Sequence, residues 1–427
     1  MTTDKATFVP EMLEEAQQRA LVGALERILE SSFLETAWPA AFEAKQCGAP
    51  ISSGDISMVV LPLDRIGAPA GASGANVYIA YYSHSSKVGP VRAASPPLVV
   101  KIGEERKLKR EKESADDWPS LSMEEKQRFA LPFHLDLGHP EWAVLIALFQ
   151  SKFDLVAAGT RNNIKVRDLW RLLADKEELL GLDDNHWEAV SQCISQALDA
   201  VNPPHRATLA QPQRKQQPYG TAYSLYLRKT TGAGELSHVP RLIFGEGATV
   251  SAFGQTWDNP ISIVEEIVSS RVFSGFVGAV HGDLHPKNIV INSESAARII
   301  DFGWAKRESH IVQDYLLLDI NLRGTTLPSQ TSEADVLALA GFLDPSEDVD
   351  SLPLMVRRRA RIIKDVVWKK ATSRAVENWE SEYLVPLLLV GYGLLVHLDR
   401  ARNQPALVAT VLATARAIRT RTLGGAP

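Results

Sequence analysis

Three side chains that can act together on a phosphate lie in one short stretch, VHGDLHPKNIVINSESAARIIDFGWA (residues 280–305). It contains the acid Asp283, the amide Asn288 and a second acid, Asp301, which begins the triplet Asp-Phe-Gly. Two apolar runs flank the small polar turn SESAA, so the stretch is predicted to form a β-hairpin whose ends carry these groups. Phosphoryl transfer uses a carboxylate that orients the attacking hydroxyl, and hard oxygen ligands that hold Mg²⁺ against the phosphates. The pattern favours that chemistry over the alternative, in which one acid caps a turn and the other only ends a strand.

The pattern H-x-D-x-x-x-x-N followed by Asp-Phe-Gly resembles the protein-kinase-like fold and, within it, the aminoglycoside/choline phosphotransferase family. The resemblance rests on HGDLHPKN and IIDFG, within residues 281–303. It implies that Asp283 is the catalytic base and that Asn288 and Asp301 are magnesium ligands. It also implies that His281 braces the catalytic loop and that the cofactors are ATP and Mg²⁺.

A lysine at the end of an apolar strand extends the resemblance toward the N-terminus. In SPPLVVKIG, Lys101 resembles the family lysine that holds the α- and β-phosphates. The usual partner of that lysine is a glutamate on the next helix, which is predicted over residues 104–118. Glu111 shares a helical stripe with Leu108 and Ala115, so we expect it to pair with Lys101. The alternative is a solvated helix beside a lysine that extends into water.

A glycine-rich turn lies between the predicted strands 56–63 and 76–82. Its residues Gly71, Ser73 and Gly74 would place backbone N–H groups over the nucleotide phosphates. A proline stands where a protein kinase would have its first glycine, which puts the individual contacts in doubt but not the location. The alternative is a plain hairpin turn.

Two departures from protein kinases concern the acceptor. His285 occupies the position where a protein kinase has a lysine, two residues after the catalytic Asp. The sequence also runs from Asp-Phe-Gly into WAKRESHIVQDYLLLD without a later Ala-Pro-Glu. In the small-molecule kinases that the chain resembles, a helix such as the one expected over 310–319 follows, and an Asp such as Asp314 anchors the loop. Both departures favour a small acceptor.

The predicted function is therefore an ATP- and Mg²⁺-dependent phosphotransferase that moves the γ-phosphate to a hydroxyl of a small molecule. One alternative is a kinase-like enzyme that modifies a protein acceptor, by phosphorylation or nucleotidylation, in bacterial signalling or defence. Another is a nucleotide-binding scaffold without turnover. The presence of the full set Lys101, Asp283, Asn288 and Asp301 argues against the scaffold.

Two charged groups of residues bear on the acceptor. The basic run RRRARIIKDVVWKK (357–370) is interpreted as the solvated face of a helix whose apolar residues point inward. Its alternative is a site for an anionic substrate or nucleic acid. A set of acids lies where the family builds its acceptor pocket and would suit a cationic acceptor, with surface solubility as the alternative. These acids are Asp154, Asp168, Asp183, Asp184 and Glu188.

The element order predicts an α+β fold, bilobal and protein-kinase-like, with a small antiparallel β-sheet N-lobe and a mostly helical C-lobe. Residues 1–50 are predicted to be a helical extension, 51–150 the N-lobe and 151–427 the C-lobe, with its catalytic hairpin at 281–303. This hairpin is the one β element expected in the C-lobe. The segment 202–220, rich in Pro and Gln, is predicted to be an exposed loop.

The composition of the chain limits the class of protein to which it can belong. The 427 residues are 45% hydrophobic with a net charge of −5, which excludes a mainly disordered chain and makes nucleic acid an unlikely partner. Cys47 and Cys193 are the only cysteines, so there is no disulfide framework. The longest apolar run, 384–398, is short for a membrane span and contains proline, glycine and histidine. It is interpreted as a buried helix, and we expect a cytoplasmic protein with no membrane partner.

Overall fold

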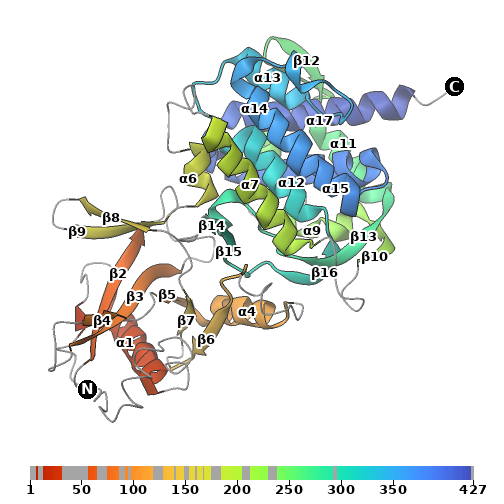
Figure 1. Cartoon of the computed structure of the whole chain (residues 1–427). Helices are drawn as coiled ribbons and strands as arrows, with labels where there is room; N and C mark the ends of the chain where they lie inside the picture. Colours follow the sequence, from red (N-terminus) through yellow and green to blue (C-terminus); the bar gives the residue numbers. More distant parts are fainter. Residues whose placement is uncertain are drawn as a thin grey trace. The chain divides into compact units, whose positions relative to one another are not determined.

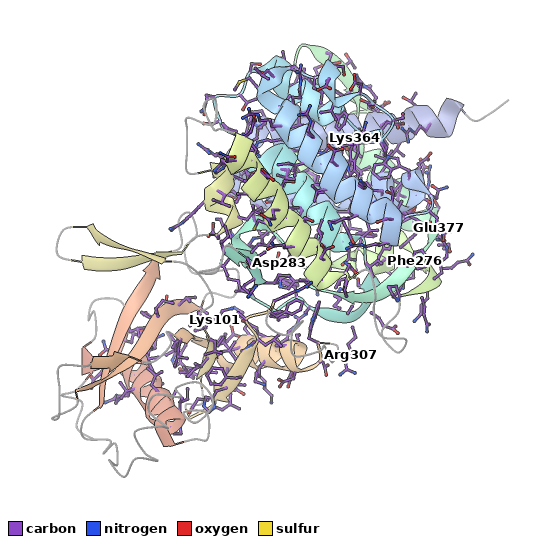
Figure 2. All side chains as sticks on the ribbon, viewed as in Figure 1. Lys101, Phe276, Asp283, Arg307, Lys364 and Glu377 are labelled. Atoms are coloured by element: carbon purple, nitrogen blue, oxygen red, sulfur yellow. The ribbon has the colours of Figure 1, made fainter. Side chains whose placement is uncertain are left out.

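The computed structural model describes residues 6–7, 13–30, 56–64, 75–85, 92–94, 98–118, 128–138, 141–148, 153–158, 161–166, 168–174, 184–203, 212–228, 238–291 and 296–424. By its internal contacts the chain divides into two compact units (Figure 1). The first unit comprises residues 1–117, 121–167 and 290–304, and the second comprises 118–120, 168–289 and 305–427.

Among the described residues of the first unit, a nine-stranded sheet forms the body. Seven strands follow in the order β6-β7-β5-β3-β2-β9-β8, with β1 against β2 and β4 against β3. Pairing is antiparallel except where β1 and β9 meet β2. The strands are β1 Ala6–Thr7, β2 Ile56–Asp64, β3 Asn76–Ser85, β4 Arg92–Ala94, β5 Leu98–Glu104, β6 Pro132–Asp136, β7 Trp142–Leu148, β8 Phe153–Ala158 and β9 Arg161–Val166.

The two faces of this sheet pack against different helices, α1 (Glu15–Glu30) and α4 (Glu105–Asp116). Successive side chains of a strand point to opposite faces, so the residues of β7 alternate between the two helices. Val144 belongs to the apolar cluster that contains Leu25 of α1. Its neighbour Leu145 packs instead with Leu108 of α4. The N-terminal helix is therefore part of the core of the first unit, alongside the sheet in Figure 1.

The second unit is mostly helical. Its α-helices are α6 Leu169–Ala174, α7 Asp184–Val201, α8 Tyr219–Ala222, α9 Ser224–Leu227, α10 Val239–Phe244, α11 Pro260–Ser270, α12 Gln313–Ile320, α13 Glu333–Gly341, α14 Leu354–Ile362, α15 Lys369–Arg374, α16 Val385–Leu394 and α17 Gln404–Gly424. π-helical turns extend α12 over Asn321–Thr325, join α14 to α15 over Ile363–Trp368 and precede α16 over Glu380–Leu384. Short 3₁₀ turns occupy Pro286–Asn288, Val349–Ser351 and Leu395–Arg400.

More β-structure follows residue 200 than the sequence predicts. A three-stranded sheet has the order β10-β13-β16, and two further pairs are β11-β12 and β14-β15. These strands are β10 Gln213–Pro218, β11 Thr249–Ala252, β12 Gln255–Asp258, β13 Val272–Val280, β14 Ile289–Ile291, β15 Ala297–Ile299 and β16 Lys306–His310. The expectation of a single hairpin in the C-terminal two-thirds is wrong.

The prediction of an exposed loop over 202–220 is wrong for residues 213–218, which form strand β10, whereas their predicted exposure is confirmed. Residues 204–211 lie outside the described residues. The β10 sequence QRKQQP has no apolar alternation that would indicate a strand. The strand forms through its main chain, which pairs antiparallel with β13 from Gln213 opposite Val277 to Pro218 opposite Val272. Such a strand is specified by its neighbour and not by its own side chains.

The predicted buried helix over 384–398 is confirmed. Among the described residues, Glu380–Arg400 is the one helical stretch that is long and apolar enough to cross a membrane, and 72% of its most apolar window is buried inside the structure. Leu384, Leu388 and Leu395 are fully buried. This burial is that of a core helix.

The predicted fold class is confirmed: the chain is α+β, with its large sheet in the N-terminal part and a helical C-terminal part. The stripe predicted on the helix over 104–118 is confirmed as well. Leu108, Glu111, Ala115 and Trp118 are all buried.

Replacing Leu25 by alanine should destabilise the first unit by about 2–5 kcal/mol, because Leu25 is fully buried between α1 and the sheet. Urea unfolding followed by circular dichroism measures the change. Arg19→Ala, on the exposed side of the same helix, is the control and should change stability by less than about 0.5 kcal/mol. Equal stability of the Leu25→Ala variant and the wild type would contradict the docking of α1.

Candidate active site

The first group of predicted site residues lies in the first unit, around Lys101 of strand β5. Lys101 Nζ is 2.5 Å from Glu111 Oε1, and both side chains are less than a tenth exposed. Glu111 comes from α4, which packs on the sheet through Leu108, one turn before it. Of the four glutamates on or next to this helix, the structure therefore brings Glu111 to the lysine. A buried ion pair with good geometry is costly to break from either side.

Asp301 joins the same group. Its Oδ2 lies 3.4 Å from Lys101 Nζ, and a quarter of its side chain is exposed. The backbone of Asp301 has φ of 67°, a left-handed conformation that a residue other than glycine seldom adopts. Strain of this kind persists where surrounding structure enforces it, and it concentrates at functional sites.

The surrounding structure is a short backbone ladder next to Asp301. The N–H of Ala130 donates to the carbonyl of Ile299 at 2.8 Å, and the Ile299 N–H donates to the carbonyl of Arg128 at 3.0 Å. Phe302, which follows Asp301, is fully buried and packs edge-on against Phe129. This ladder and this aromatic contact hold the Asp-Phe-Gly segment in place.

The second group lies in the second unit, in the segment that follows β13. Residues 281–288 of this segment are predicted to form the catalytic loop. The backbone N–H groups of His281 and Gly282 both donate to the carboxylate of Asp314 at 2.9 Å. Asp314 is fully buried in the first turn of α12. Gly282 has φ of 76°, so the turn that the carboxylate holds requires glycine. His281 is fully buried and takes part through its backbone, as a bracing residue would.

Asp283 follows this turn with 28% of its side chain exposed. The side-chain amide of Asn288 donates to the Asp283 carbonyl at 2.9 Å and lies 3.4 Å from Asp283 Oδ2. This contact orients the amide, so that its oxygen is directed away from Asp283. The predicted base, Asp283, and the predicted metal ligand, Asn288, thus contact each other within one loop.

The catalytic loop has two sides. Asp283, His285 and Lys287 are partly exposed, whereas the residues between them are buried. His285 Nδ1 accepts from the N–H of Lys287 at 3.2 Å, and its Nε2 lies 3.6 Å from Asp283 Oδ2. Lys287 Nζ lies 4.5 Å from the ring centroid of Trp170, a cation–π contact with α6. The loop therefore presents an acid and two basic side chains on one side.

The predicted metal ligands have suitable chemistry for Mg²⁺. Asp301 supplies a carboxylate and Asn288 an amide oxygen, both hard donors. Among the described residues no group of three or more His, Cys, Asp or Glu side chains could hold a metal ion. Mg²⁺ is commonly held by one or two carboxylates together with water and substrate phosphates, so this donor set fits.

The predicted glycine-rich turn, with Gly71, Ser73 and Gly74, lies outside the described residues. So does Asp183, whereas Asp154 lies in β8, where its backbone alone is described. Asp168 accepts from the N–H of Arg171 at 2.8 Å at the start of α6.

The basic run over 357–370 is in part a solvated helix face, as predicted, because Val356, Ile363 and Val367 are fully buried beneath it. Arg359 is the exception. It is 2% exposed, its guanidinium donates to the carbonyls of Leu322, Leu173 and Thr326, and burial lowers its pKa to about 9.

Other basic side chains of this region pair with acids or carbonyls of the second unit. Arg358 bonds Asp184 at 2.7 Å, and Lys370 and Arg374 share Asp199. Burial raises the pKa of Asp199, but the hydrogen bonds and positive charges of Lys370 and Arg374 outweigh this effect and hold the pKa below its usual value. These contacts favour a structural role for the run over a site for an anionic ligand.

Two contributors to the site have no signal in the sequence motifs. Phe129 lies in a stretch without a clear element pattern, yet it supports Phe302. Arg110 of α4 lies over the ring of Trp304 at 5.5 Å, next to the Asp-Phe-Gly segment. Both contacts join residues that are far apart in the chain.

Comparisons with known proteins bear on this geometry. A family model described as Ternary complex associated domain 9 matches residues 186–393, just under half of the chain. No curated protein matches the chain at the sequence level. Solved structures match over most of the chain at low identity.

One such structure is an aminoglycoside phosphotransferase, APH(4)-Ia, in complex with AMP-PNP and hygromycin B: 10% identity, 90% of this chain and 98% of that chain, TM-score 0.39. A second is the choline kinase LicA from Streptococcus pneumoniae: 11% identity, 78% and 90% covered, TM-score 0.32. A third is the ROP18 kinase domain with AMP-PNP and sucrose: 12% identity, 96% and 97% covered, TM-score 0.35. The predicted resemblance to kinase-like phosphotransferases is confirmed.

Replacing Lys101 by methionine should destabilise the first unit by about 3–5 kcal/mol, because it removes the ammonium group that pairs with the buried carboxylate of Glu111. The double variant Lys101→Met/Glu111→Leu removes both charges and should recover most of that loss. Chemical unfolding of the three proteins measures the difference.

Lys107→Met is the matched control, because Lys107 pairs with Glu104 at the half-exposed surface of the same helix. It should cost less than about 1 kcal/mol. A double variant no more stable than Lys101→Met would contradict the buried ion pair.

Proposed function

We propose that this chain is an ATP- and Mg²⁺-dependent phosphotransferase that transfers the γ-phosphate to a hydroxyl of a small molecule. The observation that carries the proposal is the buried Lys101–Glu111 pair with Asp301 held in a strained conformation beside it. A buried ion pair contributes little to net stability, and a strained Asp detracts from it. A requirement to bind a charged ligand would explain why the ion pair and the strained Asp occur together.

Lys101, Asp301 and Asn288 would supply the contacts to the nucleotide and its metal ion. Lys101, oriented by Glu111, places its ammonium against the nucleotide phosphates. Asp301 and Asn288 would hold Mg²⁺ through their side-chain oxygens. When bound, Mg²⁺ neutralises the charge on the phosphates during transfer.

Asp283 would orient the acceptor. Its partly exposed carboxylate accepts the hydrogen of the acceptor hydroxyl, whose oxygen forms the new bond to the γ-phosphorus. The bond from that phosphorus to the bridging oxygen breaks and ADP departs. Asp314 and Asn288 hold the loop, so the carboxylate is already placed before the acceptor binds. Positioning and electrostatics supply the rate, without a covalent enzyme intermediate.

The acceptor assignment rests on His285, which stands where protein kinases have a lysine, and on the lack of an Ala-Pro-Glu sequence after Asp-Phe-Gly. A second candidate is a kinase-like enzyme that modifies a protein. The family model that matches residues 186–393 is named for association with a ternary complex, and a protein acceptor would be one way for this chain to take part in such a complex. Intact-mass analysis of candidate proteins after incubation with ATP separates the transfer of a phosphoryl group from that of a nucleotide.

Asp283→Asn should lower the rate of ATP consumption in the presence of a pooled metabolite extract by about 10²–10⁴-fold, because the amide cannot accept the hydroxyl proton. Affinity for ATP should be unchanged. Asp350→Asn, which alters an exposed acid paired with Arg361, is the control and should keep full activity. Full activity of Asp283→Asn would contradict its assignment as the base.

Asp301→Asn should weaken the Mg²⁺-dependent part of ATP binding, because a neutral amide is a poorer magnesium ligand than a carboxylate. The measurement is the rise in melting temperature on adding ATP, with Mg²⁺ and with EDTA. The wild type should show a larger rise with Mg²⁺, and the variant should show nearly the same rise in both. A Mg²⁺ effect of equal size in the two proteins would contradict the role of Asp301.

A further inference from the structure

The short helix α9 carries a tyrosine whose hydroxyl reaches the catalytic loop. Tyr226 Oη donates to the carbonyl oxygen of Gly282 at 3.1 Å. That carbonyl belongs to the peptide that leads directly into Asp283. The two residues are 56 positions apart in the chain, and α9 comes from the segment between α7 and β13, to which the sequence gives no function.

The surroundings of Tyr226 keep its hydroxyl protonated. Burial raises the pKa of Tyr226 well above its ordinary value, and the negative charges of Asp314 and Asp283 raise it further. A protonated hydroxyl is a hydrogen-bond donor, which is what a carbonyl requires.

The backbone of α9 is held tightly where Tyr226 lies. A Cβ added to Gly393 of α16 would lie 2.6 Å from both the Cβ and the carbonyl oxygen of Tyr226. A glycine at position 393 is therefore what allows α16 and α9 to approach so closely. The N–H of Tyr226 donates to the Tyr223 carbonyl at 3.0 Å. The backbone of Tyr226 is thus held against α16 and within its own helical segment, and neither belongs to the catalytic loop.

Gly282 is consequently held at both of its polar backbone atoms. Its N–H donates to Asp314, and its carbonyl accepts from Tyr226. With φ of 76° and no side chain, Gly282 would otherwise be the most freely rotating residue of the loop. The carbonyl contact sets the plane of the peptide from which Asp283 extends.

We propose that Tyr226 is a positioning residue for the reaction, which sets the orientation of the Gly282–Asp283 peptide and through it the carboxylate of Asp283. Tyr226 acts through that peptide and not on the reacting atoms. The catalytic part of this inference rests on the proposed phosphotransferase function, whereas its structural part does not.

The test is Tyr226→Phe, which removes only the hydroxyl. Loss of one hydrogen bond that positions the base should lower kcat for ATP consumption about 3- to 10-fold, with KM for ATP unchanged. Tyr223→Phe is the matched control, because it removes a hydroxyl from the same helical region whose partner is His310 and not the loop. It should leave kcat unchanged.

Amide hydrogen exchange of both variants supplies a measurement that needs no turnover. Tyr226→Phe should raise exchange locally, in the peptide that covers His281 to Asn288, because the loop opens more readily without its carbonyl contact. Tyr223→Phe should leave that peptide protected. A Tyr226→Phe protein whose exchange is unchanged there, or is raised equally throughout the second unit, would overturn the proposal. Absence of turnover in the wild type would count against the phosphotransferase function, and the exchange result would still decide the role of Tyr226.

Discussion

The buried carboxylate of Asp314 is the interaction on which the catalytic loop depends. An ionised carboxylate without partners is costly inside a protein, and here it accepts two backbone N–H groups at 2.9 Å. The carboxylate also fixes the turn before Asp283. This turn is possible because Gly282 adopts a left-handed backbone conformation. Asp314 lies in the first turn of α12, whose residues are all buried, so its hydrogen bonds fix the loop to the helical core. If Asp283 is the base, as proposed, its carboxylate needs no reorganisation when an acceptor binds.

In the first unit, a comparable constraint operates through the alternation of strands. Residues of β5 and β7 send alternate side chains to α1 and to α4, so the sheet has two apolar faces and needs a helix on each. Lys101 falls on the face covered by α4, and its ammonium meets Glu111 there at 2.5 Å. The packing of an apolar layer thus determines where a buried charge can lie. The N-terminal helix contributes to the site indirectly, because it completes the opposite face of the sheet that carries Lys101.

Local patterns in the sequence predicted the features that have local causes. The helical stripe of Leu108, Glu111 and Ala115 selected the glutamate that pairs with Lys101. Features that depend on contacts between distant segments were not predictable from one sequence. The polar strand β10 exists because β13 pairs with it, and Phe129 acquires a role only once it meets Phe302. The basic run around Arg359 predicts a surface charge, but in the structure Arg359 is buried. Its guanidinium donates hydrogen bonds to carbonyls of residues distant in the chain.

The proposed transfer of the γ-phosphate from ATP to a small molecule is tested most directly by following a labelled γ-phosphate. Purified wild-type protein and the Asp283→Asn variant would be incubated with γ-labelled ATP, Mg²⁺ and a metabolite extract, and the products separated by size and charge. We expect the label to enter a small organic molecule in the wild-type reaction, and we expect this labelled product to be absent from the reaction of the variant. Label that is released only as inorganic phosphate, at equal rates in the two proteins, would contradict the account, and so would label that remains entirely in ATP.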